Sequence, residues 1–425
     1  MKKKILFYAL MIGMVFLFIR AADYLIYYVF LRYNTSFVLM PRNDETMGTN
    51  SLGLRGPEPS PSADESLGLF IGDSFTMGMG VPEKNSYVRI TEKKLLDRGL
   101  KVEHMNAGIA GYSPANSLGL LEHLGTDQSI DYVVFTLYSN DIFDLGDNVF
   151  LSALLNKELN KPHVAILYFV APRITSYFYY SQLAALGNQL SLNNNLTLDR
   201  VHKNLQSEEQ RSPAPAQPAA NAQEEPTGEQ NLKLMLFMEQ IRKLALHADI
   251  SESAYNEWMR KNQKNVSLAI DGKINLVEVL TPLFFPEHFE QCIDLSHGGE
   301  EKFTILKEIL LRMKAYANQK EARFILVFIP ADVRYSKEKW DLAKSYGYVM
   351  KEDWLTGQSE LEKRLVDFTE EHDIAYLPLT EELRQMDKQG IHATFPRDIH
   401  LNSTGHSAVA DPIADFLEQE LRSTR

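Results

Sequence analysis

A buried strand that ends in a serine is the feature that most constrains this chain. The apolar run Leu67–Ile71 stops at Gly72, Asp73 and Ser74, and a helical segment follows. Strands and helices that alternate along a chain predict a parallel sheet, and ligands bind at the carboxyl ends of such strands. We therefore expect the serine hydroxyl at that edge of the sheet, where a nucleophile belongs. Taken alone, the three residues also fit a simple turn with helix-capping side chains.

The same alternation recurs along the chain. Further strands are expected over 101–107, 132–138, 323–330 and 374–377. Helices are expected over 87–96, 115–124, 359–371 and 403–421. The strand over 132–138 is apolar almost throughout, which is typical of a strand covered on both faces. The pattern predicts an α/β fold built on a sheet of about five parallel strands.

Residues 1–32 are expected to form a membrane segment. Three lysines precede an apolar run from Ile5 to Ile19, and a second apolar run reaches Leu31. No small-residue cleavage site follows, so we expect an uncleaved signal-anchor. As a helix, ~27 residues would cover ~40 Å, which is enough to cross a bilayer. The lysines predict that the amino terminus lies inside and the rest of the chain outside the cytoplasm, in a periplasmic or extracellular location.

The amino-acid composition divides the rest of the chain into a stalk, an α/β domain and an insertion. Residues 33–66 are polar and turn-rich and are expected to form a stalk. The α/β domain is expected in two parts, 67–145 and 321–425, which flank an insertion over 146–320.

The insertion has a mixed character. Residues 206–230 are rich in Pro, Ala, Gln and Glu and are expected to be disordered, because they cannot bury a core. Helices expected over 232–246, 252–264 and 300–320 form either a cap over the site or a peripheral layer. An irregular aromatic piece is expected over 283–289.

Charge and cysteine usage exclude some functions. The net charge of −12 argues against nucleic-acid binding, since phosphate recognition needs a basic face. The single cysteine, Cys292, has no second thiol for a disulfide, metal or redox motif. It is expected to be a small buried side chain.

A motif near the carboxyl terminus supplies what a serine nucleophile needs. His400 lies in a loop just before the last helix, and Asp398 comes two residues earlier. A serine needs a histidine to take its proton, and an aspartate holds that histidine in the right tautomer. Acyl transfer also needs donors to an oxyanion, and three strand ends offer them: the N–H groups of Ser74 and Gly111 and the side-chain amide of Asn140. This chemistry requires no metal or cofactor.

In these motifs the chain resembles the SGNH or GDSL-type lipase and esterase superfamily. The four blocks of that family are matched in order by Gly72-Asp73-Ser74, the run from Asn106 to Gly111, Asn140-Asp141, and Asp398 with His400. The resemblance covers residues 67–145 and 320–421.

The resemblance implies a flavodoxin-like three-layer α/β/α fold. It also implies a triad of Ser74, His400 and Asp398, and an oxyanion hole formed by Ser74, Gly111 and Asn140. The resemblance extends to membrane-anchored bacterial members of the family, in which a segment similar to Asn50–Gly56 precedes the serine block.

Some positions depart from the family pattern or are compatible with two roles. Ser139 stands where the family usually has glycine, and the aspartate precedes the histidine by two residues where three are common. His406 is a rival base, but it falls inside the last expected helix, so His400 is preferred. Arg55 either binds an anionic substrate group or links the stalk to the domain.

The function expected from these features is that of an extracytoplasmic serine esterase or lipase. The same residues would serve an O-acyltransferase or a deacetylase acting on envelope polysaccharide, because water and a sugar hydroxyl compete for one acyl-enzyme. A scaffold that only binds an envelope glycan or a protein is a third class, against which the full set of catalytic residues weighs. Acylated glycan is the first choice of substrate, and a lipid is the alternative.

Overall fold

The computed structural model describes residues 2–26, 39–40, 42–44, 48–145, 166, 169–171, 238–239, 241–243, 245–246, 248, 250–270 and 273–423. They belong to two compact units, one drawn from 1–34, 146–197 and 235–257 and the other from 35–145, 198–234 and 258–425. The disorder expected over 206–230 lies outside the described residues, as does most of the helix expected over 232–246.

The first unit contains helix α1, Lys2–Ile26, at the position of the expected membrane segment. Within the described residues, no helix combines the length and the apolar character that crossing a membrane requires. Elsewhere in this unit Arg242 pairs with Glu239 and with Glu252, at 2.9 Å in each case. The second of these pairs ties Arg242 to the first turn of α10, Glu252–Ile270.

The second unit is built on a parallel sheet, as the alternating pattern predicted. Its strands are β1 (Ser66–Gly72), β2 (Val102–Gly108), β3 (Tyr132–Tyr138), β4 (Arg323–Ile329) and β5 (Ala375–Pro378). They lie in the order β2-β1-β3-β4-β5, and all neighbouring pairs are parallel. This is the flavodoxin-like order, so the expected α/β fold on about five parallel strands is confirmed.

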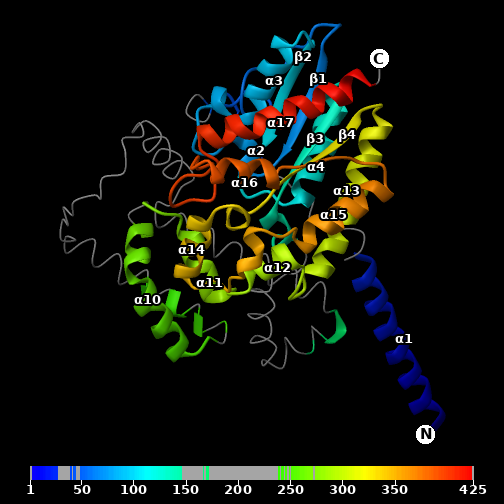
Figure 1. Cartoon of the computed structure of the whole chain (residues 1–425). Helices are drawn as coiled ribbons and strands as arrows, with labels where there is room; N and C mark the ends of the chain where they lie inside the picture. The colour runs from blue at the N-terminus through cyan, green and yellow to red at the C-terminus, as the bar shows by residue number, and fades with distance from the viewer. Residues whose placement is uncertain are drawn as a thin grey trace. The chain divides into compact units, whose positions relative to one another are not determined.

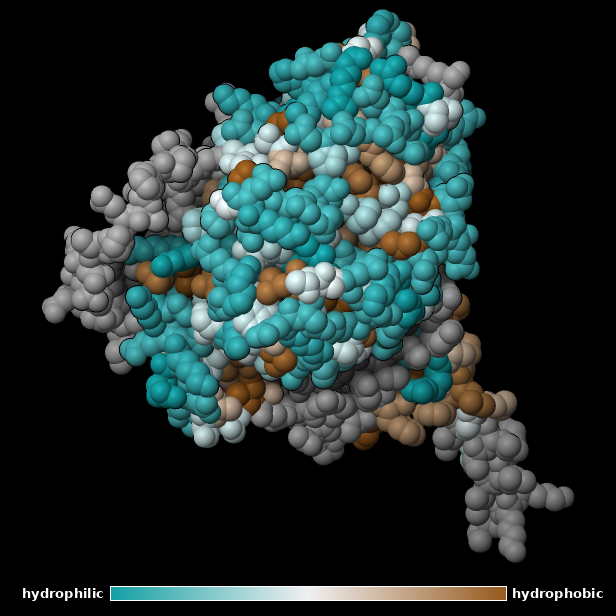
Figure 2. All heavy atoms as spheres, in the orientation of Figure 1, coloured by the Kyte–Doolittle hydropathy of each residue, from teal (hydrophilic) through white to brown (hydrophobic). Residues whose placement is uncertain are grey.

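Helices cover both faces of the sheet (Figure 1). On one face α3 (Tyr87–Asp97) packs against α17 (Ser403–Arg422), and on the other α4 (Pro114–Asp127) packs against α13 (Gly299–Gln319). Every residue of β3 is buried, which accounts for its almost continuously apolar sequence. The face of the molecule in Figure 2 is mainly hydrophilic, with hydrophobic residues in small groups.

The second unit also contains shorter helices. Two of them, α2 (Ser74–Met77) and α15 (Glu360–Glu371), were expected from the sequence. Those that were not expected are α11 (Leu276–Phe284), α12 (His288–Asp294), α14 (Lys337–Tyr346) and α16 (Thr380–Lys388). Single turns of 3-10 helix follow β3 at η3 (Ser139–Ile142) and β4 at η4 (Asp332–Arg334). The piece over 283–289, which was expected to be irregular, is divided between the end of α11 and the start of α12.

Residues 49–56, which were expected to belong to a stalk, pack against the sheet. Arg55 forms an antiparallel bridge with Asn106 of β2, and the Leu54 side chain is fully buried. The Arg55 guanidinium donates to the carbonyls of Met77 at 2.7 Å, Gly78 at 2.6 Å and Val81 at 2.6 Å. These contacts occupy the guanidinium, so of the two roles considered for Arg55 the structure supports the structural one.

Replacing Arg55 should therefore destabilise the domain. Arg55→Met leaves three buried carbonyls without their donor, and hydrogen bonds from charged groups are worth about 1.5–3 kcal/mol each. We expect a loss of about 3–5 kcal/mol in the free energy of unfolding, measured by urea denaturation of the purified protein.

Arg98→Met is the matched control. Arg98 pairs with Asp415 and Glu418 at a partly exposed position, and such pairs contribute about 1 kcal/mol or less. Equal losses in the two variants would contradict the role given to Arg55.

Candidate active site

Ser74 is the first residue of α2 and follows the sharp turn at the end of β1. Asp73 caps this helix, with its Oδ1 accepting from the N–H of Phe75 at 2.9 Å. Gly78 ends the helix at a φ of 77°, a conformation that favours glycine. Because both ends are fixed and Arg55 binds the last carbonyls, the backbone holds the Ser74 side chain in place. Ser74 is 8% exposed, so its hydroxyl keeps limited access to solvent.

The end of β2 lies directly against this turn. Gly72 and Gly108 are partners in the β1–β2 register, and a Cβ on Gly108 would lie 2.1 Å from the Met77 nitrogen. Only glycine therefore allows this close approach. Gly111 follows three residues later with a φ of 77°, and a Cβ placed there would meet nothing within 4 Å. The structure thus places Gly111 in a loop at the same sheet edge as Ser74, next to open space.

Asn140 lies in η3, directly after β3. Its Oδ1 is buried and has no hydrogen-bond partner in the described part of the chain. Ser139, where the family usually has glycine, accepts from the N–H of Ala331 at 2.8 Å and so ties the end of β3 to the end of β4. Asp141 accepts from the N–H of Tyr138 at 2.8 Å and closes the turn. The first three strands thus bring Gly111, Ser74 and Asn140 to one edge.

The structure joins Ser74, His400 and Asp398 by hydrogen bonds. The Ser74 Oγ lies 2.8 Å from Nε2 of His400, and Nδ1 of His400 bonds to Oδ1 of Asp398. All three residues are buried. With Asp398 ionised, Nδ1 carries the ring proton, so Nε2 is free to accept from the serine hydroxyl.

The two-residue spacing between Asp398 and His400 has a local explanation. Oδ1 of Asp398 accepts from the backbone N–H of His400 at 2.8 Å as well as from its ring. The His400 carbonyl in turn accepts from the N–H of Phe395 at 3.1 Å. One carboxylate oxygen therefore fixes both the loop and the imidazole, so a single intervening residue, Ile399, is enough.

Three residues that were not identified from the sequence hold this loop. Asn275, the cap of α11, donates to Oδ2 of Asp398 at 3.3 Å, and Glu278 accepts from the N–H of Ile399 at 3.2 Å. Lys339 donates to the Asp398 carbonyl at 2.8 Å. Asn275 before an apolar run is a recognisable helix start, but no sequence signal links these three residues to a loop so distant in the chain.

The charges within the triad favour a basic histidine. Burial lowers the pKa of His400, but the charge and hydrogen bond of Asp398 outweigh it, and the pKa is raised above its ordinary value. Burial raises the pKa of Asp398, but the charge and hydrogen bonds of His400 more than offset this effect and lower it. Asp398 therefore stays ionised and stabilises an imidazolium beside it.

His406 has a different environment. Its Nδ1 accepts from the N–H of Tyr87 at 3.2 Å, and the two rings stack with centroids 5.8 Å apart. Burial lowers the pKa of His406 to about 3, so the ring is neutral. His406 thus joins α17 to α3, and it is His400 that contacts Ser74.

Cys292 is fully buried, as expected, and burial raises the pKa of its thiol. In the described ranges, no group of three or more His, Cys, Asp or Glu side chains is arranged to hold a metal ion.

The charge of Asp398 should be visible in the titration of His400. We expect the His400 ring to titrate above 6.5 in the wild type. In Asp398→Asn the charge is lost and burial dominates, so the midpoint should fall below its wild-type value. The measurement is an NMR titration of histidine-labelled protein, with His400→Asn assigning the signal.

Asp97→Asn provides the control, since Asp97 is an exposed partner of Lys93 on α3. If the titration midpoint of His400 is unchanged in Asp398→Asn, that result would contradict the pairing of Asp398 with His400.

Comparisons with known proteins are sparse. No protein-family model matches the chain, and no curated protein matches it. Among solved structures the chain is similar to the crystal structure of TesA, with 11% identity, a TM-score of 0.34 and coverage of 83% of this chain and 99% of that one. It is also similar to a member of the lipolytic protein G-D-S-L family from Veillonella parvula DSM 2008, with 11% identity, a TM-score of 0.33 and coverage of 82% and 97%. The G-D-S-L family is the one that the motifs of this chain resemble.

Proposed function

We propose that this protein is a serine hydrolase of the SGNH type that cleaves carboxylic esters. The observation that carries the proposal is the buried chain of contacts from Ser74 Oγ to His400 Nε2, at 2.8 Å, and from His400 Nδ1 to Asp398. A nucleophile, a base and an orienting carboxylate in this order are the requirements for covalent acyl transfer.

In the proposed reaction the Ser74 Oγ attacks the ester carbonyl carbon while His400 Nε2 takes the hydroxyl proton. The imidazolium is stabilised by Asp398, and it gives the proton to the leaving alcohol as the carbon–oxygen bond breaks. This leaves the acyl group on Ser74. His400 then takes a proton from water as the water oxygen attacks the acyl carbon. The bond from that carbon to Ser74 Oγ breaks, the His400 imidazolium returns the proton to Oγ, and the carboxylic acid leaves.

The oxyanion formed in each step needs donors that are already in place. The backbone N–H groups of Ser74 and Gly111 and the amide nitrogen of Asn140 come from three adjacent strand ends. Fixed donors of this kind contribute strongly, because they need no rearrangement as charge develops. We assign the three groups to the oxyanion hole on this basis.

Ser74→Ala should abolish both the hydrolysis of p-nitrophenyl acetate and covalent labelling by a fluorophosphonate probe. Both readouts need the Ser74 oxygen as nucleophile. Mass spectrometry of the labelled wild-type protein should place the adduct on Ser74. Labelling that persists in Ser74→Ala would refute the proposal.

A matched pair of histidine variants tests the base. His400→Asn should approach the activity of Ser74→Ala, because residues that act as a unit are not additive. His406→Asn keeps an acceptor for the N–H of Tyr87 and should retain most of the activity. The reverse ranking would make His406 the base.

We also propose that the amino-terminal segment is a signal-anchor that holds the domain outside the cytoplasm. The lysine cluster before Ile5 and the apolar run up to Ile19 support this proposal. The substrate would then be an acylated glycan or lipid of the envelope, with water or a glycan hydroxyl as the acyl acceptor.

This topology predicts that alkaline phosphatase, fused after Arg425 and active only outside the cytoplasm, will be active in cells. The fusion should sediment with membranes and keep its original amino terminus. A fusion without Ile5–Leu31 should be inactive. A shortened, soluble product of the full-length fusion would instead indicate cleavage.

A further inference from the structure

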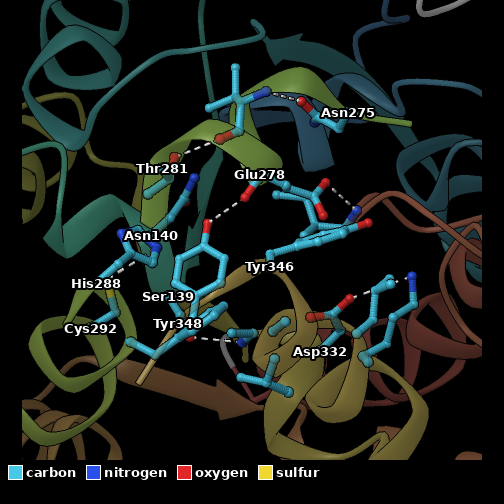
Figure 3. Close-up of a pocket in the computed structure, with 18 of the residues that line it drawn as sticks. Ser139, Asn140, Asn275, Glu278, Thr281, His288, Cys292, Asp332, Tyr346 and Tyr348 are labelled. Carbon is cyan, nitrogen blue, oxygen red and sulfur yellow. Dashed lines mark hydrogen bonds and ion pairs between the residues drawn. The ribbon is translucent and has the colours of Figure 1, made fainter. Parts of the chain in front are cut away.

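A small cavity lies beside the candidate catalytic residues, between the ends of β3 and β4 and the helices α11, α12 and α14. Its volume is about 110 Å³. Figure 3 shows Asn140 and His288 on one side, Tyr346 and Asp332 on the other, and Tyr348 between them. The Tyr348 hydroxyl donates to the Glu278 carbonyl at 3.1 Å, which fixes the ring in the cavity wall.

The cavity adjoins the catalytic residues at three points. Asn140, the proposed oxyanion donor, is one of its lining residues. Ile399, between the two triad residues of the last loop, also lines it, as does Asn275, which donates to Asp398 at 3.3 Å. Ser74 and His400 are not part of the lining. The cavity is therefore a side pocket of the catalytic site rather than the site itself.

This arrangement indicates which part of an ester the pocket would take. The carbonyl carbon carries an oxygen that must reach Asn140, a leaving oxygen that must reach His400, and an acyl chain. Asn140 lines the pocket and His400 does not, so the leaving alcohol, which must reach His400, lies outside the pocket. The acyl chain is the substituent that remains.

The size of the pocket limits the chain. A cavity of ~150 Å³ is enough to hold one benzene ring, so a cavity of about 110 Å³ holds fewer heavy atoms than that. An acetyl or butyryl group fits this space, and a chain of about eight carbons exceeds it.

The polarity of the pocket wall further limits which acyl groups the pocket can bind. Asn140 Oδ1 and His288 Nδ1 are buried, and neither has a partner within the described residues. A long alkyl chain would leave both atoms unpaired, which is unfavourable, whereas a short chain leaves room for water or a hydroxyl. Burial, with the charge of Asp398, raises the pKa of Glu278 well above its ordinary value, and Lys339 lies 3.7 Å from Asp332. An uncharged acyl group suits this wall.

We propose that this pocket is the acyl subsite of the enzyme and selects uncharged acyl chains of about two to four carbons, a range set by its volume. The assignment rests on the proposed function and deepens it, because it names the substrate class.

The test compares p-nitrophenyl acetate, butyrate and octanoate as substrates of the purified full-length protein in detergent. We expect kcat/KM for acetate and butyrate to exceed that for octanoate by about tenfold or more, since one methylene in a filled pocket changes selectivity ~10–200-fold. Tyr348→Ala enlarges the pocket and should raise kcat/KM for octanoate relative to that for acetate by about tenfold. Ala343→Leu fills the pocket and should lower kcat/KM for butyrate relative to that for acetate by a similar factor.

Matched controls lie outside the pocket. Tyr316→Ala removes a tyrosine from α13, and Ala254→Leu enlarges an exposed position on α10. Neither should change the chain-length profile. Titration of active sites with the fluorophosphonate probe corrects each variant for the fraction that is folded.

Two results would overturn the subsite while leaving the proposed function intact. One is a chain-length profile that neither pocket variant changes, in proteins that the probe labels fully. The other is a Tyr348→Ala protein whose selectivity changes between methyl and p-nitrophenyl butyrate and not between acyl chains, which would place the alcohol in the pocket. Failure of the probe to label the wild type would overturn the proposed function itself.

Discussion

The paired contacts between Asp398 and His400 are the interaction on which the candidate site depends. One carboxylate oxygen accepts from both the backbone and the ring of His400, so the loop conformation and the ring orientation are set together. Asn275, Glu278 and Lys339 hold the loop from outside. The same carboxylate reverses the effect of burial on the pKa of His400. A change in this loop would therefore alter geometry and basicity at once.

The same sheet edge carries two buried carboxyls. Burial raises the pKa of Asp73 to about 6, and burial with the charge of Asp73 raises the pKa of Asp141 well above its ordinary value. Asp73 and Asp141 are positioning residues that close backbone turns through their side chains. Their partial neutralisation limits the repulsion that two adjacent carboxylates would cause.

Much of the fold and part of the site could be predicted from the sequence, because the relevant signals are local. Four of the five strands are short, mainly apolar runs, and the residues that follow β1, β2 and β3 had to meet at one edge once the strands were parallel. Asp398 and His400 are close in the chain, so their pairing needed no knowledge of the fold. The choice of His400 over His406 rested on the helix expected over 403–421, and the contact of His400 with Ser74 agrees with it.

The amino-acid sequence alone determined where the strands form, which residue types lie at their ends, and the Asp398–His400 motif. Only the tertiary structure decided that Arg55 donates to carbonyls at the end of α2, and that Asn275 and Glu278 of the insertion hold the loop of Asp398 and His400. It also decided that a small pocket adjoins Asn140. These features join segments that are distant in the chain. Hydrophobic periodicity shows which faces are buried but not which partners they meet, so such contacts leave no pattern in the sequence.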